Sequence, residues 1–233
     1  MTVSLSKLLD PLHDRVLDGL EFARIAFRLF DEVYELPDDG KTLRERKGDV
    51  KPLLEEVLPI ARFALAHYGQ GQYLTVRWVR GSQPFDAKLV SHGGRVDHGM
   101  WPAQSTLEVT TAQHPNEYLM RERLNSEGGA FGLEGLTRIK GPAGAKSVAS
   151  VPTVHSSLET INAMATLILG SIQAKAATNY PQDTTLIVNV ELNGLYLDEE
   201  WRQLVHIVRE RCPSHGFNAV FLCAGPGIYS TSL

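Results

Sequence analysis

The sequence lacks the cysteines, the long apolar runs and the excess of positive charge that mark several classes of protein. Its 233 residues include only two cysteines, Cys212 and Cys223, too few for a disulfide framework or a four-cysteine zinc site. The N-terminus has no signal-peptide pattern, and the longest apolar stretch, Ala163 to Ile172, is too short to cross a bilayer. We therefore expect a cytoplasmic protein in a reducing environment, without a membrane partner.

The composition is that of an ordinary folded domain. Hydrophobic residues make up 43% of the chain and charged residues 21%, which excludes a disordered or fibrous protein. The formal net charge of −4 excludes a surface that is basic throughout, although a local basic strip is compatible with it. The length favours one core with an additional helical segment.

Helical periodicity dominates the N-terminal part of the chain. From Leu5 to Leu36 apolar residues recur at three- and four-residue intervals, which predicts one long amphipathic helix or a helix pair. Residues 37–49 are rich in turn formers and charges and indicate a connector. A second helix is predicted from Val50 to Tyr68, with a kink or a new first turn at Pro59.

The hydrophobic period then changes from about 3.6 residues to two. Three segments, Tyr73–Arg80, Phe85–Ser91 and Thr106–Ala112, alternate apolar and polar residues and predict a meander of three strands. The remaining predicted elements are a helix, a loop, a helix capped by Ser157, a strand, a helix and a strand, at residues 117–125, 128–144, 157–180, 185–192, 198–211 and 219–224. The final strand, helix and strand favour parallel pairing.

Two acidic residues of the meander are candidates for chemistry. Asp86 and Lys88 alternate with apolar residues in the second strand, and Glu108 does so in the third. If both apolar sides face the core, Asp86 and Glu108 lie on the same side of the sheet. Such a pair can bind Mg²⁺, which accepts one or two carboxylates together with water and phosphate oxygens. The alternative is that both acids are solvated on an open face.

Other patterns are weaker. His92, Asp97, His98 and His114 surround the connection between the second and third strands, but their spacing matches no zinc motif, so we interpret them as turn and surface residues. The glycine-rich segment Gly128–Gly135 lacks the lysine and hydroxyl of a phosphate-binding P-loop. We interpret it as a flexible loop able to close over a ligand.

The order of these elements carries a resemblance to a known family. An acidic helix, three strands with acids in the second and third, a long helix and a further strand follow one another in the segments LLEEVLPIARFA (53–64), QPFDAKL (83–89), LEVTTA (107–112) and SIQAKAATNYPQDTTLIV (171–188). This series resembles the core of the PD-(D/E)XK nuclease superfamily, the restriction-endonuclease-like fold. The resemblance implies an α/β core at residues 50–233 with a mixed central sheet flanked by helices, preceded by an N-terminal helical extension and linker at residues 1–49.

The resemblance also implies roles for individual acids. Asp86 matches the metal-binding aspartate of the family, and Glu108 matches the acid of its third-strand (D/E)xK motif, so these two residues would bind Mg²⁺ or Mn²⁺. Some members add a helical acid, which would be Glu56 or its neighbour Glu55; we favour Glu56, which lies further from the apolar stripe of the helix.

The chain departs from the family at the motif lysine, because position 110 is threonine. A threonine hydroxyl cannot supply positive charge to the transition state. Lys88 on the second strand or Lys175 on the following helix would have to supply it. Either lysine is equally compatible with an ordinary solvated position.

These observations predict a magnesium-dependent phosphodiester hydrolase that acts on nucleic acid. Basic residues near the sheet would form a rim for phosphates, unless neighbouring acids make them ordinary mixed surface: Arg44, Arg46, Lys47, Lys51, Arg77, Arg80, Arg121 and Arg123. The alternative is a catalytically inactive domain of the same fold that serves as an interaction module, with a homodimer formed through the N-terminal helix. A hydrolase of a small phosphorylated ligand is a third possibility.

Overall fold

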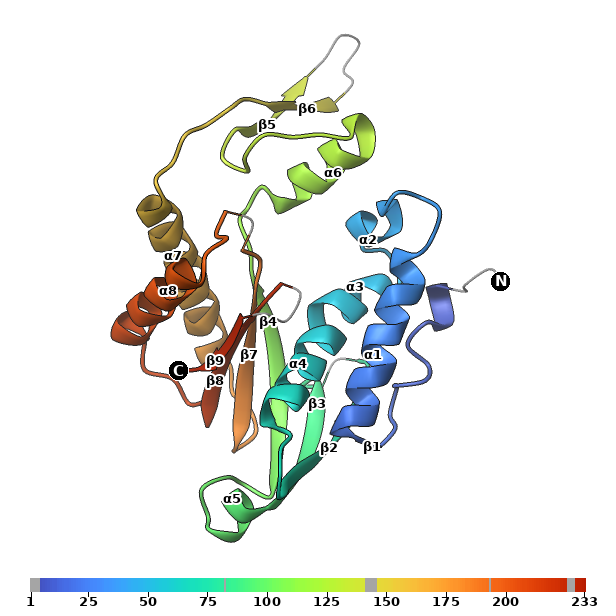
Figure 1. Ribbon diagram of the computed structural model, residues 1–233, viewed down its shortest axis with the longest axis vertical. Coiled ribbons are helices and arrows are strands. Elements are labelled where there is room, and N and C mark those ends of the chain that lie inside the picture. The colour runs from blue at the N-terminus through green and yellow to red at the C-terminus, as the bar shows by residue number, and fades with distance from the viewer. Residues whose placement is uncertain (1–4, 82, 141–145, 193, 226–228) are drawn as a thin grey trace.

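A mixed β-sheet of seven strands, counted over the described residues, forms the centre of the computed structural model, with helices on both faces (Figure 1). The structure describes residues 5–81, 83–140, 146–192, 194–225 and 229–233. In spatial order the strands are β1 (Leu17–Asp18), β2 (Gln72–Trp78), β3 (Ala87–Gly93), β4 (Gln104–Ala112), β7 (Thr184–Val190), β8 (Ala219–Ala224) and β9 (Tyr229–Ser232). The predicted α/β class with a mixed sheet flanked by helices is confirmed.

The pairing of the strands follows the sequence pattern closely. Strands β2, β3 and β4 form the predicted antiparallel meander, and β4, β7 and β8 pair in parallel. All seven residues of β7 are buried, as expected of a central strand covered on both faces. Strand β9, which pairs antiparallel with β8, was not predicted, because YSTS is polar and half-exposed.

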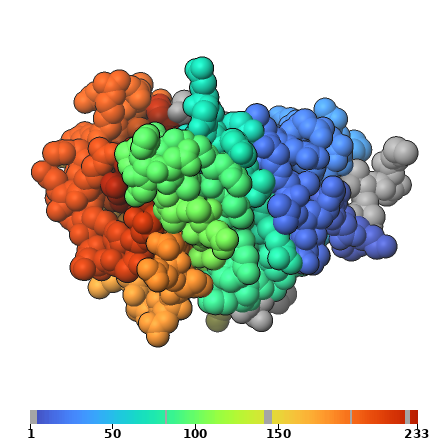
Figure 2. Space-filling view, turned by 90° about the horizontal axis from the view of Figure 1, so that it is seen from below, coloured from blue at the N-terminus to red at the C-terminus, as the bar shows by residue number. Residues whose placement is uncertain are grey.

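Two layers of helices cover the sheet. One layer contains α1 (Gly19–Tyr34), α3 (Val50–Pro52), the π-helical turn η2 (Leu53–Val57) and α4 (Leu58–His67); the other contains α7 (Ser157–Ala176) and α8 (Asp198–Arg211). Seen from below, the blue N-terminal part and the orange-red C-terminal part flank the green segment between them (Figure 2). The short elements are η1 (Leu5–Lys7), α2 (Lys41–Glu45) and α5 (Gly94–Asp97).

The N-terminal helix begins later than predicted. Residues 5–16 form a 3₁₀ turn and further turns, and α1 begins only at Gly19, after Asp18 has accepted a hydrogen bond from the amide of Leu20. Asp14 has a φ of 57°, in the left-handed region, which is incompatible with a continuous helix. Leu8, Leu9 and Leu12 are nevertheless buried and Leu5 is partly buried, so the periodicity of these residues reflects burial and not a helix.

The helix predicted from Val50 to Tyr68 is present, with its irregularity close to Pro59 as expected. The amide of Leu58 donates to the carbonyl of Leu53, five residues earlier, so the chain forms a π-helical turn. Pro59, which has no amide hydrogen, then lies in the first turn of α4. Within this turn the side chains of Glu55 and Glu56 have different partners: Glu55 accepts a hydrogen bond from Arg46, and Glu56 accepts one from Trp78.

A small unit projects beyond the end of the sheet. It consists of α6 (Glu117–Glu127), β5 (Leu136–Lys140) and β6 (Lys146–Ser150), packed on a separate cluster of Leu119, Leu133, Leu136 and Val148 (Figure 1). The loop predicted at residues 128–144 is therefore wrong over residues 136–140, where the polar strand LTRIK pairs with β6. Residues 141–144 of that loop lie outside the described residues.

The long helix α7 is capped one residue before the predicted position. Ser156, not Ser157, accepts a hydrogen bond from the amide of Glu159, whose carboxylate in turn accepts a hydrogen bond from the amide of Ser156. The helix ends at Ala176, before the predicted Tyr180. Among the helices in the described part of the chain, none combines the length and the apolar character needed to cross a bilayer.

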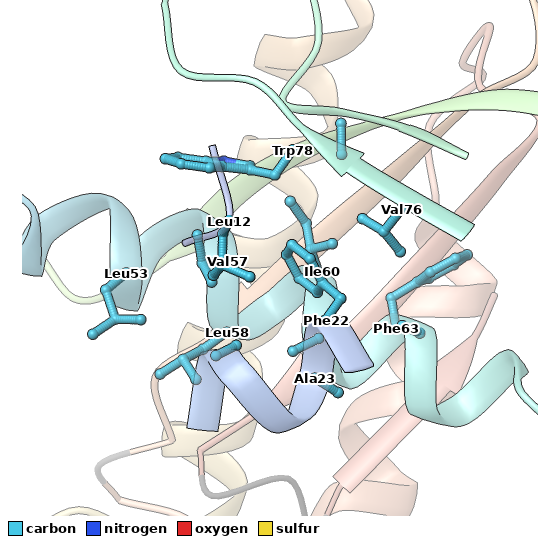
Figure 3. Packing of buried hydrophobic residues seen from close by; sticks show 14 of the residues in the cluster. Leu12, Phe22, Ala23, Leu53, Val57, Leu58, Ile60, Phe63, Val76 and Trp78 are labelled. Carbon is cyan, nitrogen blue, oxygen red and sulfur yellow. The ribbon is translucent and has the colours of Figure 1, made fainter. Parts of the chain in front are cut away.

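The N-terminal helix shares its hydrophobic core with the rest of the protein. Phe22 of α1 is fully buried together with Ile60 of α4 and Val76 of β2, and Figure 3 shows side chains from all three elements in one cluster. Whether residues 1–49 form a separate extension therefore depends on whether this cluster unfolds in one step with the rest of the protein.

We predict that Phe22→Ala lowers the free energy of unfolding by about 3–5 kcal/mol, because the substitution leaves a cavity in the core. Urea unfolding followed by far-UV circular dichroism and by tryptophan fluorescence should give one shared transition. The exposed Leu20 on the same helix supplies the control Leu20→Ala, which should change stability little. Two separate transitions, with only the first shifted by Phe22→Ala, would show that the N-terminal region unfolds independently.

Candidate functional site

Asp86 lies where β3 begins and is positioned by the pairing of β3 with β4. Ala87 is opposite Leu107 in the antiparallel register, and the amide of Asp86 donates to the carbonyl of Leu107 at 2.8 Å. Because β3 begins at this point, the amide of Val109 on β4 has no strand partner on that side. The Oδ2 atom of Asp86 accepts the bond from that amide at 2.7 Å, which fixes the carboxylate beside β4.

Glu108 lies between Leu107 and Val109 in β4, on the face of the sheet that α7 covers. Its side chain is 11% exposed. The Nζ atom of Lys175 on α7 lies 2.5 Å from its Oε1 atom, and the hydroxyl of Tyr180 donates to the same oxygen at 3.3 Å. A carboxylate and an ammonium from residues 67 positions apart thus form a largely buried ion pair.

Glu56 approaches the site from the π-helical turn η2. The indole nitrogen of Trp78, at the end of β2, donates to its Oε2 atom at 3.1 Å. The guanidinium of Arg80 lies 5.7 Å from the centre of the Trp78 ring. Glu56 is therefore oriented by a neutral donor, with positive charge nearby but not in contact.

Burial and mutual repulsion perturb these acids. Burial, together with the negative charges of Glu108 and Glu56, raises the pKa of Asp86 to about 7 against the opposing effects of the Val109 amide and Lys175. Burial also raises the pKa of Glu56, as do the charges of Glu55 and Glu108. Burial alone would lower the pKa of Lys175, but the hydrogen bond to Glu108 and the charges of Glu108, Tyr180 and Asp86 together outweigh that effect, and the pKa is raised. The three acids therefore share one electrostatic environment.

The two carboxylates proposed as metal ligands each keep one oxygen without a hydrogen bond. Over the described residues, the bonds of Asp86 use only Oδ2, and those of Glu108 use only Oε1. Hard carboxylate oxygens suit Mg²⁺ and Mn²⁺, which accept two carboxylates when water and phosphate complete the shell. The fit is limited to this pair, because the described residues contain no group of three or more histidine, cysteine, aspartate or glutamate side chains arranged to hold a metal.

No protein-family model, curated protein or solved structure matches this chain. The interpretation of the site therefore depends on its own geometry.

Four of the five candidate residues lie close enough for their charges to act on one another: Glu56, Asp86, Glu108 and Lys175. Lys88 does not join them. Its exposed side chain lies over the ring of Phe85, with 5.3 Å from Nζ to the ring centre. Thr110, at the position of the motif lysine, is half-buried in β4 opposite Val188 of β7.

The weaker sequence candidates have structural partners of their own. His92 stacks on Tyr73 with 4.7 Å between ring centres, and His114 accepts a hydrogen bond from the amide of Asn116. In the glycine-rich segment, Gly128 adopts the left-handed conformation that ends α6, and Leu133 is buried in the small cluster of the projecting unit.

Most of the predicted basic rim is neutralised within the chain. Arg77 pairs with Asp14, Arg80 with Asp49, and Arg123 with Glu127. The remaining contacts are Arg44 with Asn125, Arg46 with Glu55 and Glu191, Lys47 with Glu45, Lys51 with Glu55 at 4.0 Å, and Arg121 with Glu117 at 3.7 Å. Arg80 is the rim residue whose charge acts on the candidate site, through Glu56.

Trp78 and Tyr180 are site residues that the sequence analysis did not identify. Trp78 lies within the predicted strand Tyr73–Arg80 and is the last residue of β2, and Tyr180 is the last residue of the predicted helix 157–180. Polar aromatic residues at the ends of elements are the available signal, since a buried Trp or Tyr usually finds a hydrogen-bond partner.

We predict that Asp86→Asn stabilises the protein increasingly as the pH rises from about 4 to 7. Over this range the folded wild-type chain binds more protons at Asp86 than the unfolded chain, so its stability falls as pH increases. The raised pKa of Asp86 corresponds to a free energy of unfolding that is on the order of 4 kcal/mol higher for the variant than for the wild type at pH 8 in the absence of metal. Urea unfolding at pH 4, 6 and 8 measures it.

The control is Asp97→Asn, which changes an exposed aspartate of α5 and should not reproduce the trend. An Asp86→Asn variant that is less stable than the wild type at pH 8 would contradict the proposed repulsion among the three acids.

Proposed function

We propose that this chain is a nuclease-like, Mg²⁺- or Mn²⁺-dependent phosphodiester hydrolase that acts on nucleic acid, with a restriction-endonuclease-like core. One observation carries the proposal: Asp86, just before β3, and Glu108, on the adjacent strand β4, each keep a carboxylate oxygen without a hydrogen bond among the described residues, and the charge of Lys175 acts on both. The meander followed by a helix and a parallel strand is compatible with that core.

The protein residues would divide the hydrolysis among them. A bound divalent cation would polarise a phosphoryl oxygen and lower the pKa of a coordinated water. Asp86 and Glu108 would hold the cation, and Lys175 would stabilise the negative charge that develops on the phosphoryl group. Lys175 can reach this position from α7 because it already contacts Glu108.

Glu56 would act as the general base. Burial raises its pKa, so it accepts a proton closer to neutral pH than an ordinary carboxylate does. Water would lose its proton to Glu56 and attack the phosphorus, the phosphorus–oxygen bond to the leaving sugar would break, and solvent would protonate the leaving oxygen. The indole of Trp78 would keep the carboxylate of Glu56 oriented during this step.

The alternative function is a catalytically inactive domain of this fold that acts as an interaction module. Thr110 at the position of the motif lysine favours it, as do the ion pairs that neutralise the basic rim. A homodimer would then use the exposed side of α1, where Leu20 and Tyr34 are 45% and 65% exposed. Its buried side already packs in the core.

We predict that Mn²⁺ binds to the wild-type chain and that Asp86→Asn and Glu108→Gln each weaken binding at least tenfold, because each removes a charged ligand. Isothermal titration calorimetry at pH 8 measures the affinity. Binding by the wild type should also weaken between pH 8 and pH 6, because protonation of Asp86 near pH 7 competes with the metal.

We further predict that Lys175→Met lowers Mg²⁺-dependent cleavage of labelled single- and double-stranded DNA by about 10²–10³-fold, the usual cost of losing one transition-state electrostatic contact. Mn²⁺ affinity should be kept, because Lys175 contacts the Oε1 atom of Glu108 and leaves the other carboxylate oxygen to the metal. Lys88→Met is the matched control and should cleave at nearly the wild-type rate.

Cleavage that survives metal chelation, or that is unchanged in both carboxylate variants, would defeat the catalytic proposal. A wild-type homodimer in light scattering, with neither metal affinity nor cleavage, would support the interaction module.

A further inference from the structure

A cavity lies at the carboxyl ends of the parallel strands β7 and β8, and none of Glu56, Asp86, Glu108 and Lys175 lines it. Its volume is about 790 Å³, within the range of small-molecule sites. Apolar side chains from the layer of α1, η2 and α4, and from the segments that follow β7 and β8, form most of its wall, including Phe27, Phe30, Leu54, Leu58, Leu195 and Tyr229. Open α/β sheets commonly bind ligands at this edge.

Two arginines line the cavity, and only one of them is neutralised. Arg46 forms ion pairs with Glu191 at 2.7 Å and with Glu55 at 3.3 Å. Arg62 on α4 contacts the amide oxygen of Asn189 at 3.3 Å, and over the part of the chain that the structure describes it has no carboxylate partner. Its Nε atom is buried without a hydrogen bond.

The other neighbour of Arg62 does not supply the missing negative charge. Burial raises the pKa of the Cys223 thiol to about 11, even though Arg62 opposes the shift, so the thiol is neutral at physiological pH. Burial also lowers the pKa of Arg62 itself, but a guanidinium remains protonated in proteins. The fold therefore keeps a cation largely out of water with only neutral polar contacts, which is unfavourable unless an anion completes the pair.

We propose that this cavity binds a small amphipathic anion whose carboxylate or phosphate group pairs with Arg62 and whose apolar body packs against Phe27, Leu58 and their neighbours. Glu191 does not repel this ligand strongly, because Arg46 neutralises it. The inference is independent of the proposed hydrolase activity, because it depends on none of the acid-site residues.

The test uses the full chain and four probes with the same ten-carbon tail: decanoate, decyl phosphate, decanol and decylammonium. Calorimetry below the micelle concentrations should show saturable binding of one anion per chain, with decanol and decylammonium at least tenfold weaker. The ratio of the decanoate and decyl phosphate affinities identifies which head group the site prefers. A failure of the wild-type chain to bind either anion would overturn the proposal.

Variants separate the charge from the cavity. Arg62→Met should weaken anion binding at least tenfold and leave decanol binding within about twofold, whereas Arg24→Met, at an exposed arginine of α1, should change neither. Leu54→Trp should fill the cavity and weaken binding of both decanoate and decanol. Unchanged anion affinity in Arg62→Met, or decylammonium bound as tightly as decanoate, would refute the pairing.

Thermal unfolding gives a second readout that a purely structural arginine would not produce. Without ligand, Arg62→Met should unfold at the same or a higher temperature than the wild type, because the uncompensated cation is gone. Decanoate should raise the unfolding temperature of the wild type and not that of the variant. A strongly destabilised Arg62→Met chain, together with a wild type that decanoate does not stabilise, would show that Arg62 has only a structural role.

Discussion

The register between β3 and β4 is the constraint on which the candidate site depends. Ala87 pairs with Leu107, and this pairing places Asp86 beside Glu108. A slip of one residue would turn the side chains of β3 to the opposite face. The apolar residues Ala87, Leu89 and Leu107 are all buried, so the hydrophobic core fixes the register. The juxtaposition of the two acids therefore follows from the packing of their apolar neighbours, although it is itself electrostatically unfavourable.

Lys175 makes that juxtaposition tolerable by bringing positive charge from another layer. Its ammonium group contacts Glu108, and its charge also lowers the pKa of Asp86 against the larger effect of burial. The position of Lys175 is determined by α7, whose residues Ile168 and Ile172 are fully buried against the sheet. The cation of this ion pair comes from the helix that crosses β4, so the pair depends on tertiary packing.

The sequence predicted the elements whose burial has a regular period and failed where contacts between distant segments decide the conformation. The alternation in β4 and the stripe of α8 identified both elements, whereas the leucines near Leu9 are buried in turns, where the Leu9 amide is held by Asp49, 40 residues away. The same distinction applies to the site. The alternation of apolar and polar residues predicted that Asp86 and Glu108 lie on one side of the sheet. It could not decide between Lys88 and Lys175, because only the path of α7 over the sheet shows which lysine reaches the acids.

The π-helical turn η2 lies between the acid pair Asp86 and Glu108 and the cavity that contains Arg62. Each of these sites holds buried charge that is unfavourable without a ligand. Adjacent residues of this turn are oriented differently: Glu55 pairs with Arg46 at the cavity, and Glu56 is held by Trp78 near the acid pair. The irregular turn, one of the uncommon elements that frequently occur at functional sites, accounts for this divergence. The favourable packing of the two large cores offsets the cost of burying Asp86 and of burying Arg62, which has no carboxylate partner among the described residues. Buried charges without a counter-charge are expected at ligand sites, because the ligand supplies the missing charge. A bound cation would neutralise the acids, and a bound anion would neutralise the arginine.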